Sequence, residues 1–275
     1  MIRTEEVMER GWKEKNCVDL MVFAGQSNMS GRGEAADAAR CPVEAGWEYK
    51  CISRPGQLVP IVEPFGLGED REGALDDRRD GGTKRTGSMV SAAVGEYYRR
   101  TGRKTVAVSA SRGGSSTEQW LNVLLEDALD RVDRTMEFLK SREISVDRRF
   151  LIWCQGETDA DHMVSAEEYI RRTEKIIQGF LEHGIGKCFL VQIGHYNDPA
   201  AADDSGEVAG EEKDQYYRVI RDAQLRLCLD RKEVVLAASF EPYLHEMKDR
   251  FHYRQEAYNE VGLHVGRKLA RSQYR

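Results

Sequence analysis

Short apolar runs alternate with amphipathic segments along most of the chain. Five runs are rich in Val, Ile, Leu and Phe: 18–24, 105–110, 150–154, 188–193 and 234–238. Continuous apolar runs of this length are typical of parallel strands buried on both faces. The segments between and after them repeat apolar residues at helical spacing: 88–100, 117–140, 166–183, 212–229 and 255–272. Strands that alternate with helices predict an α/β fold, a three-layer α/β/α sandwich around a central parallel sheet of about five strands.

Two long segments interrupt this alternation. Residues 32–85 are rich in Gly, Asp and Arg and hold four of the six prolines, and a second such stretch covers 195–210. Loops this long inside a compact domain are usually functional or partly disordered. Both follow strands at the carboxyl edge of the sheet, where open α/β sheets bind ligands. We expect one domain over 18–275, with a long insertion loop at 32–85 and an N-terminal extension at 1–17.

Composition narrows the classes of function. The 275 residues are 40% hydrophobic and 32% charged, an ordinary balance for a folded protein, and the net charge of -6 argues against nucleic acid as a partner. No apolar run approaches the roughly 20 residues that cross a bilayer, so we expect no membrane partner. The first 16 residues lack the apolar centre of a signal peptide, which predicts a cytoplasmic protein, or a secreted one if a leader was removed. Nothing in the sequence indicates the oligomeric state.

The six cysteines are widely spaced and include no C-x-x-C pair. Buried free thiols are the favoured interpretation, because a chain of this length needs no disulfide framework. Only Cys41 and Cys51, in a loop-like region, are placed so that they could pair. No clustered Cys/His set suggests zinc, and we expect neither a metal nor an organic cofactor.

Ser27 directly follows the first apolar run, in the segment Gly25-Gln26-Ser27-Asn28-Met29. This position places a hydroxyl at the carboxyl end of a strand. Such a serine can attack an ester carbonyl if a histidine takes its proton and backbone N–H groups stabilise the oxyanion. A serine that caps a helix or a turn would occupy the same kind of position, so this motif alone leaves both interpretations open.

Two further strand ends carry polar motifs. Ser111-Arg112-Gly113-Gly114-Ser115-Ser116 follows the second predicted strand, and its glycines allow a backbone amide to approach a ligand closely. Gln155-Gly156-Glu157-Thr158-Asp159 follows the third, where the Gln155 amide could donate to an oxyanion and the acids could orient neighbouring groups. Each motif alone is equally consistent with an ordinary turn.

Asp249-Arg250-Phe251-His252 lies just before the last predicted helix. An acid three residues before a histidine can hold one ring nitrogen while the other faces a serine. Five other histidines compete for the role of base: His162 and His195 follow strand ends, His183 and His264 fall in predicted helices, and His245 lies in a loop. The neighbouring acid favours His252.

Together these motifs resemble the sialate O-acetylesterase and acetyl-xylan-esterase-like branch of the SGNH hydrolases, whose fold is flavodoxin-like. The resemblance spans 18–266 and includes Trp120, Asn259 and Gly262. It implies that Ser27 is the nucleophile, His252 the general base and then acid, and Asp249 the partner that orients His252. It also implies an oxyanion hole formed by the Ser27 and Gly114 backbone amides and the Gln155 side chain. Gln26, Asn28 and Glu157 are implied as supporting residues, with Glu157 holding the loop around Ser27.

The resemblance therefore implies a carbohydrate O-acetylesterase that acts through an acetyl-serine intermediate on an acetylated carbohydrate. Alternatives are a lipase-like or thioester hydrolase on the same scaffold, and a carbohydrate-binding relative that has lost catalysis. The charged stretch 66–85 resembles the family less, and we interpret it as solvated surface rather than a substrate contact. Several aromatic residues could offer an apolar face to a sugar ring or pack in the core: Trp47, Tyr49, Phe65, Trp120 and Tyr196.

Overall fold

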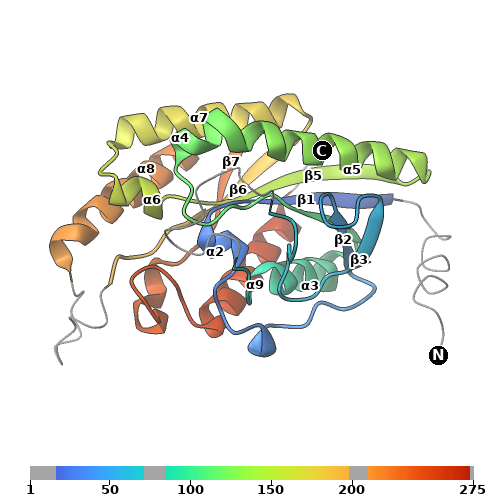
Figure 1. Ribbon diagram of the computed structural model, residues 1–275, viewed down its shortest axis with the longest axis horizontal. Helices are drawn as coiled ribbons and strands as arrows, with labels where there is room; N and C mark the ends of the chain where they lie inside the picture. The colour runs from blue at the N-terminus through green and yellow to red at the C-terminus, as the bar shows by residue number, and fades with distance from the viewer. Residues whose placement is uncertain (1–16, 71–83, 198–209, 273–275) are drawn as a thin grey trace.

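The computed structural model describes residues 17–70, 84–197 and 210–272, and within them the chain folds around one seven-stranded sheet (Figure 1). The strand order is β3-β2-β4-β1-β5-β6-β7, and all neighbouring strands are parallel except β2 and β3. The strands are β1 (Cys17–Gly25), β2 (Gly46–Lys50), β3 (Gln57–Pro60), β4 (Thr105–Ser109), β5 (Ser145–Cys154), β6 (Lys187–Gln192) and β7 (Val234–Ser239).

Helices cover both faces of this sheet, as Figure 1 shows. The α-helices are α2 (Ser27–Ser30), α3 (Val90–Thr101), α4 (Thr117–Gln119), α5 (Leu125–Ser141), α6 (Glu157–Asp161), α7 (Ala166–Glu182), α8 (Glu211–Asp230) and α9 (Gln255–Arg271). A π-helical turn, Trp120–Leu124, separates α4 from α5, so the predicted helix at 117–140 is interrupted. Short 3₁₀ turns cover Ala35–Asp37 and Glu241–Glu246.

The two faces have separate cores because side chains alternate along each strand. Met21 and Phe23 of β1 pack with α3 and α9, whereas Leu20 and Val22 pack on the opposite side with α5 and α7. Both faces of β1 are therefore buried, which explains why its sequence is a continuous apolar run. The predicted three-layer α/β/α class is confirmed.

All five predicted strands are present, but the prediction of about five strands was too low. The additional β2 and β3 lie inside the expected loop 32–85, and β3 runs antiparallel to β2. Continuous apolar runs did not reveal β2 because the polar residues Glu48 and Lys50 interrupt it. Both are almost fully buried, and Lys50 Nζ pairs with Glu48 Oε1 at 2.7 Å. Desolvation of this site raises the pKa of Glu48 to about 7. β3 was obscured by its short length, its partial exposure and its terminal Pro60.

The structure also bears on the cysteines, on the two segments that it describes only in part and on possible membrane-spanning helices. All six cysteines are free thiols, including Cys41 and Cys51. The N-terminal extension 1–17 lies outside the described residues except for Cys17, and 71–83 of the charged stretch 66–85 also lies outside them. Among the described helices, none has the length and apolar character that crossing a bilayer requires.

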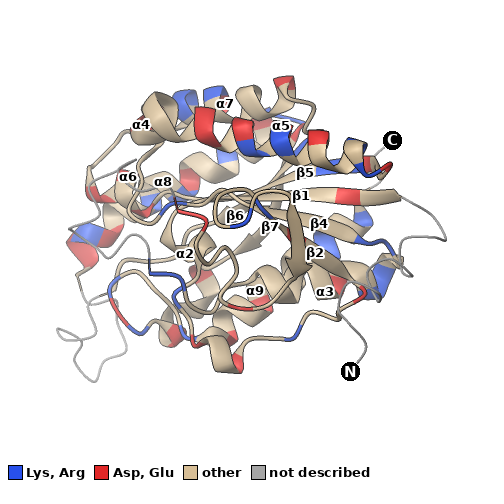
Figure 2. Ribbon diagram, turned by 45° about the vertical axis from the view of Figure 1, so that its right-hand side comes forward, with Lys and Arg blue, Asp and Glu red and all other residues tan. Residues whose placement is uncertain are grey.

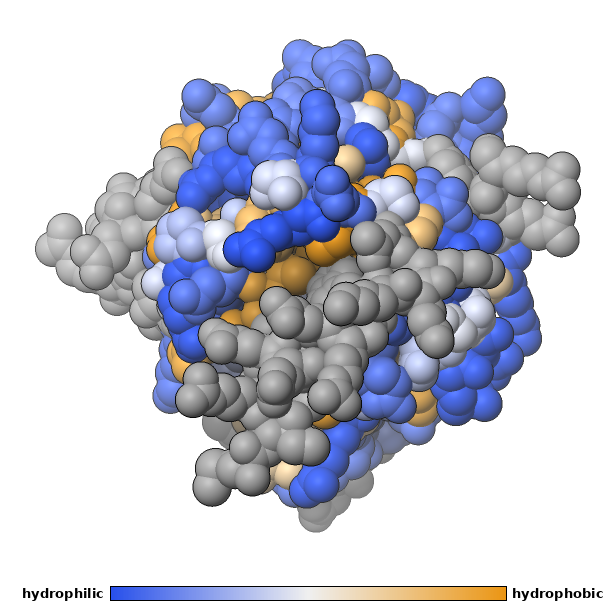
Figure 3. Space-filling view, turned by 90° about the vertical axis from the view of Figure 1, so that its right-hand side faces the viewer, coloured by the Kyte–Doolittle hydropathy of each residue, from blue (hydrophilic) through white to orange (hydrophobic). Residues whose placement is uncertain are grey.

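Acidic and basic residues are interspersed along α5 and α7, whereas the strands between the helical layers contain few charged residues (Figure 2). The side of the molecule where β1 begins is mostly hydrophilic, with a smaller apolar area near its centre (Figure 3). The polar motifs predicted from the sequence lie at the opposite, carboxyl edge of the sheet.

Candidate active site

Ser27 begins α2 directly after β1, and the turn between them requires a glycine. Gly25 has φ +134°, and a Cβ at this position would lie 1.9 Å from the Cys154 carbonyl oxygen of the neighbouring strand. The Gln26 backbone N–H donates to the same carbonyl at 2.9 Å. β1 and β5 are thus held together at their carboxyl ends, and this contact fixes where Ser27 leaves the sheet.

Ser27, His252 and Asp249 form a continuous hydrogen-bonded chain. Ser27 Oγ lies 2.9 Å from His252 Nε2, and His252 Nδ1 lies 2.9 Å from Asp249 Oδ2. The other Asp249 oxygen accepts the backbone N–H groups of Phe251 at 2.9 Å and His252 at 2.8 Å. Burial would raise the pKa of Asp249, but the hydrogen bonds from His252 and the backbone outweigh it and lower the pKa to about 2. An ionised Asp249 keeps the proton on Nδ1, which leaves Nε2 free to accept the Ser27 proton.

The competing histidines lie in other surroundings. His195 Nδ1 lies 2.9 Å from Asp214 Oδ2, and Arg221 also pairs with that carboxylate. His183 Nδ1 contacts a backbone carbonyl, and His162 is exposed at the end of α6. Of the six histidines, all within the described residues, His252 is the one that contacts Ser27.

Asn28, the residue after Ser27, links the Ser27 turn to the loop that carries His252. Its Nδ2 donates to Glu157 Oε1 at 2.5 Å and to the carbonyl of Phe251, next to His252, at 3.0 Å. Its Oδ1 accepts the Tyr258 hydroxyl at 2.6 Å. Burial raises the pKa of Glu157, and the hydrogen bond from Asn28 opposes that rise. The turn that carries Ser27 is thereby tied to the loop that carries His252.

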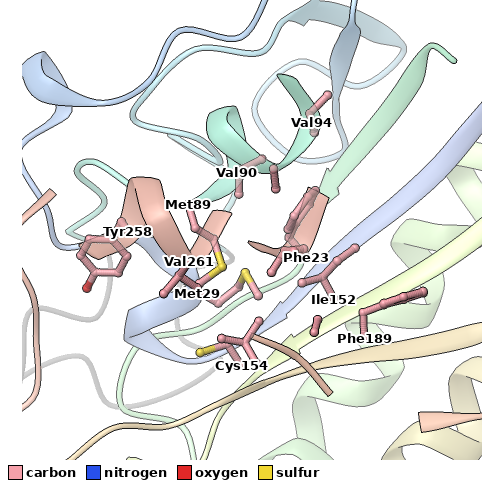
Figure 4. Close-up of a cluster of buried hydrophobic side chains, with 14 of the residues drawn as sticks. Phe23, Met29, Met89, Val90, Val94, Ile152, Cys154, Phe189, Tyr258 and Val261 are labelled. Carbon is pink, nitrogen blue, oxygen red and sulfur yellow. The ribbon is translucent and has the colours of Figure 1, made fainter. Parts of the chain in front are cut away.

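Apolar packing against the core also fixes the position of α2. Met29 inserts into the core among Met89, Val261 and Cys154, and the Tyr258 ring lies at the margin of this cluster with its hydroxyl directed away from it (Figure 4). Sequence reasoning missed Tyr258 because a tyrosine in the apolar stripe of α9 looks like ordinary core. Its role depends on a contact with Asn28, 230 positions away in the sequence.

The segment after β4 carries Gly114, which the sequence predicts as an oxyanion donor. Gly114 has φ +67°, in the left-handed region that favours glycine. Among the described residues, neither the Gly114 nor the Ser27 backbone N–H donates a hydrogen bond. Both amides are therefore available to a ligand.

Gln155 is placed differently from a simple oxyanion donor. It is fully buried, and its Nε2 faces three acceptors: Gln26 Oε1 at 3.2 Å, the Ser115 carbonyl at 3.1 Å and Asp159 Oδ2 at 2.5 Å. Gln26 Oε1 also accepts the backbone N–H groups of Gly156 and Thr158. A direct hydrogen bond from Gln155 to a substrate would require exchange of one of these acceptors.

The aromatic residues considered for sugar stacking are largely core. Trp47, Tyr49, Phe65 and Trp120 are all at most 4% exposed. Tyr196 lies against Phe251 at the edge of the site, with their ring centroids 5.9 Å apart. No group of three or more potential His, Cys, Asp or Glu metal ligands occurs within the described residues.

An α/β sandwich that brings a serine and a His–Asp pair together at the carboxyl edge of its sheet is the arrangement that the resemblance to SGNH hydrolases led us to expect. The family model described as carbohydrate esterase, sialic acid-specific acetylesterase, matches residues 17–271. The chain belongs to this family and is a carboxylic-ester hydrolase.

Solved structures share the fold at low sequence identity. A protein from Arabidopsis thaliana superposes with a TM-score of 0.65 at 20% identity, over 92% of this chain and 97% of its own. A carbohydrate acetylesterase from Xanthomonas citri gives a TM-score of 0.52 at 17% identity, over 90% of this chain and 55% of its own. This chain thus spans about half the length of the Xanthomonas protein. No curated protein sequence matches the chain.

Proposed function

We propose that this esterase removes acetyl groups from carbohydrate hydroxyls through an acetyl-Ser27 intermediate. The observation that carries the proposal is the chain of two 2.9 Å hydrogen bonds from Ser27 through His252 to Asp249. The carbohydrate substrate class rests on the family.

In the first half-reaction, Ser27 Oγ attacks the acetyl carbonyl carbon while His252 Nε2 takes the hydroxyl proton. The negative charge that develops on the carbonyl oxygen is held by the Ser27 and Gly114 backbone N–H groups. Asp249 stabilises the imidazolium that forms. When the tetrahedral intermediate collapses, the C–O bond to the sugar breaks and His252 returns the proton to the departing alkoxide.

In the second half-reaction, His252 takes a proton from water, whose oxygen attacks the acetyl-serine carbonyl. The same amides hold the oxyanion, the bond to Ser27 Oγ breaks, and acetate leaves as the serine regains its proton. No other reactant is needed. Gln155 is proposed as a third donor by family resemblance, through exchange of one of its present acceptors.

The proposal is tested with 4-nitrophenyl acetate, butyrate and octanoate, using wild type, Ser27→Ala and Ser141→Ala. Ser141 lies at the end of α5, and within the described residues its exposed hydroxyl bonds only the Phe138 carbonyl. It is the matched serine control. We expect acetate to be the preferred ester, Ser27→Ala to lose at least 10³-fold in kcat, and Ser141→Ala to match wild type. Mass spectrometry of acid-quenched enzyme should find an added acetyl group on the peptide that contains Ser27.

Wild-type activity in Ser27→Ala would disprove the nucleophile, and preference for octanoate would replace the acetylesterase with a lipase-like enzyme. Acetate release from acetylated xylo-oligosaccharides and acetylated sialic acids then identifies the sugar. Failure on every acetylated sugar, with activity on simple acetates intact, would contradict the carbohydrate assignment.

A further inference from the structure

The short helix α6 carries two buried carboxyl groups that point to different parts of the site. Glu157 bonds Asn28, on the side of the nucleophile and base. Asp159, two residues later, is 0% exposed and makes no contact with that network. The mechanism above gives Asp159 no role, although burial of a carboxylate is costly unless its hydrogen bonds repay it.

Asp159 bonds to both segments that supply oxyanion donors. It accepts the Thr117 backbone N–H at 2.9 Å and the Thr117 hydroxyl at 2.5 Å, at the start of α4. It also accepts Gln155 Nε2 at 2.5 Å. Charge-assisted hydrogen bonds of this kind are among the stronger ones in proteins. One buried carboxylate therefore connects the end of the Gly114 segment to the Gln155 side chain.

The Gly114 segment is fixed at its other points as well. The Arg112 backbone N–H donates to the Gly25 carbonyl at 2.8 Å. The Ser115 hydroxyl donates to the Arg112 carbonyl at 2.7 Å and accepts Trp120 Nε1–H at 3.0 Å. The Ser115 carbonyl accepts Gln155 Nε2 at 3.1 Å. Gly114 thus lies between anchored neighbours, and one anchor on its carboxyl side, the hydrogen bond to the Ser115 carbonyl, depends on the amide orientation of Gln155.

Asp159 is one of three acceptors that set this orientation. With Nε2 toward Asp159, Gln155 also donates to the Ser115 carbonyl; with the amide reversed, its oxygen would face the carboxylate, that carbonyl and Gln26 Oε1, and all three contacts would become repulsive. An asparagine at 159 could keep its oxygen on Gln155 Nε2 and the Thr117 N–H, which bond the same Asp159 oxygen, and turn its NH₂ group to the Thr117 hydroxyl. An alanine at 159 removes all of these hydrogen bonds.

We propose that Asp159 is a positioning residue for the oxyanion hole, because it locks Gln155 and the Thr117 end of the Gly114 segment so that the Gly114 N–H stays directed at the reacting carbonyl oxygen. The inference rests on the proposed esterase mechanism. It divides the acids of α6 between two tasks: Glu157 supports the Ser27–His252 contact, and Asp159 supports the stabilisation of charge.

The experiment compares 4-nitrophenyl acetate with its thionoacetate analogue, in which sulfur replaces the carbonyl oxygen. Sulfur accepts hydrogen bonds weakly, so the thionoacetate gains less from the oxyanion hole than the acetate does. The ratio of kcat/KM for the acetate to kcat/KM for the thionoacetate therefore measures oxyanion stabilisation separately from the nucleophile and base. For Asp159→Ala we expect kcat on the acetate to fall by about tenfold to hundredfold with KM within about twofold, and the acetate-to-thionoacetate ratio of kcat/KM to fall by a similar factor.

Glu157→Gln is the matched control, since it changes the other buried acid of the same helix. It should slow both substrates alike and leave the ratio at the wild-type value. Thr117→Val, which removes one donor to Asp159 and retains the backbone N–H, should lower the ratio by a smaller factor. Thr117→Val decides the question if Asp159→Ala does not fold.

An Asp159→Ala enzyme whose activity falls while the ratio stays at the wild-type value would overturn the inference, because that pattern marks a general structural defect. Failure of the proposed function looks different. In that case wild type itself does not hydrolyse the acetate, or Ser27→Ala keeps its activity.

Discussion

Asp249→Asn changes one atom type and isolates the orienting role of the carboxylate. In the native site one oxygen accepts two backbone N–H groups, from Phe251 and His252, while the other accepts the His252 ring N–H. The asparagine carbonyl can keep both backbone hydrogen bonds. Its NH₂ group then faces His252 Nδ1, which must become an acceptor. The ring proton moves to Nε2, where it faces Ser27 and blocks proton transfer.

The magnitude follows from this change of tautomer. Loss of the correct tautomer in a Ser–His–Asp site costs about 10⁴-fold in kcat, which corresponds to about 5.4 kcal/mol in the barrier. The Asp249 side chain is 48% exposed and two of its hydrogen bonds survive, so we expect the variant to fold. Assays of 4-nitrophenyl acetate hydrolysis at pH 7 should show the loss in kcat with little change in KM.

Asp214→Asn provides the matched control, because Asp214 makes the same 2.9 Å contact to His195. It should leave kcat within about threefold of wild type if its fold is intact. An Asp249→Asn enzyme that retains more than a tenth of the wild-type kcat would refute the argument, since the tautomer of His252 would then be set by something other than Asp249.

Three further substitutions probe the supporting structure. Tyr258→Phe leaves Asn28 Oδ1 without its donor at 2.6 Å, and we expect chemical denaturation to show a loss of about 1–3 kcal/mol together with a several-fold lower kcat. Gly25→Ala places a methyl group 1.9 Å from the Cys154 carbonyl oxygen at a positive φ, and the melting temperature should fall sharply; an unchanged value would contradict the close approach. Hydrogen bonds from Arg99, with others from neighbouring arginines, lower the pKa of Glu96 from its ordinary value of 4.5 to about 2. Its stabilisation is present above about pH 4.5 and is lost as the pH falls toward 2, so Glu96→Gln should flatten stability against pH in this window.

The sequence predicted the parts of the fold in which local pattern and environment agree. β1 reads as a buried strand because both of its faces are apolar and both are covered. β2 does not, because its buried charges are compensated by each other and by the Leu67 carbonyl. The Glu48–Lys50 pair is local, but the burial of both side chains and the hydrogen bond to Leu67, 17 positions from Lys50, depend on the tertiary structure.

The same distinction separates the candidate site residues. Asp249 and His252 are three positions apart, so their contact could be predicted from local spacing. Ser27 was predicted from its place at a strand end. The hydrogen bond of Asp159 to Thr117 spans 42 positions, and that of Tyr258 to Asn28 spans 230, so their roles appear only when the sheet brings the strand ends together.

The contact between Ser27 and His252 joins residues 225 positions apart, and neither residue determines the distance by itself. On one side, the Gln26 N–H on the Cys154 carbonyl fixes the nucleophile turn to the sheet. On the other, the Lys248 N–H donates to the His252 carbonyl at 2.9 Å and closes the base's loop on itself. Two separately anchored segments still need a link between them, and Asn28 supplies it through the Phe251 carbonyl. Because a displacement of about 1 Å can cost about 10²-fold in rate, we expect Asn28 to affect the proposed proton transfer as strongly as the groups that exchange the proton.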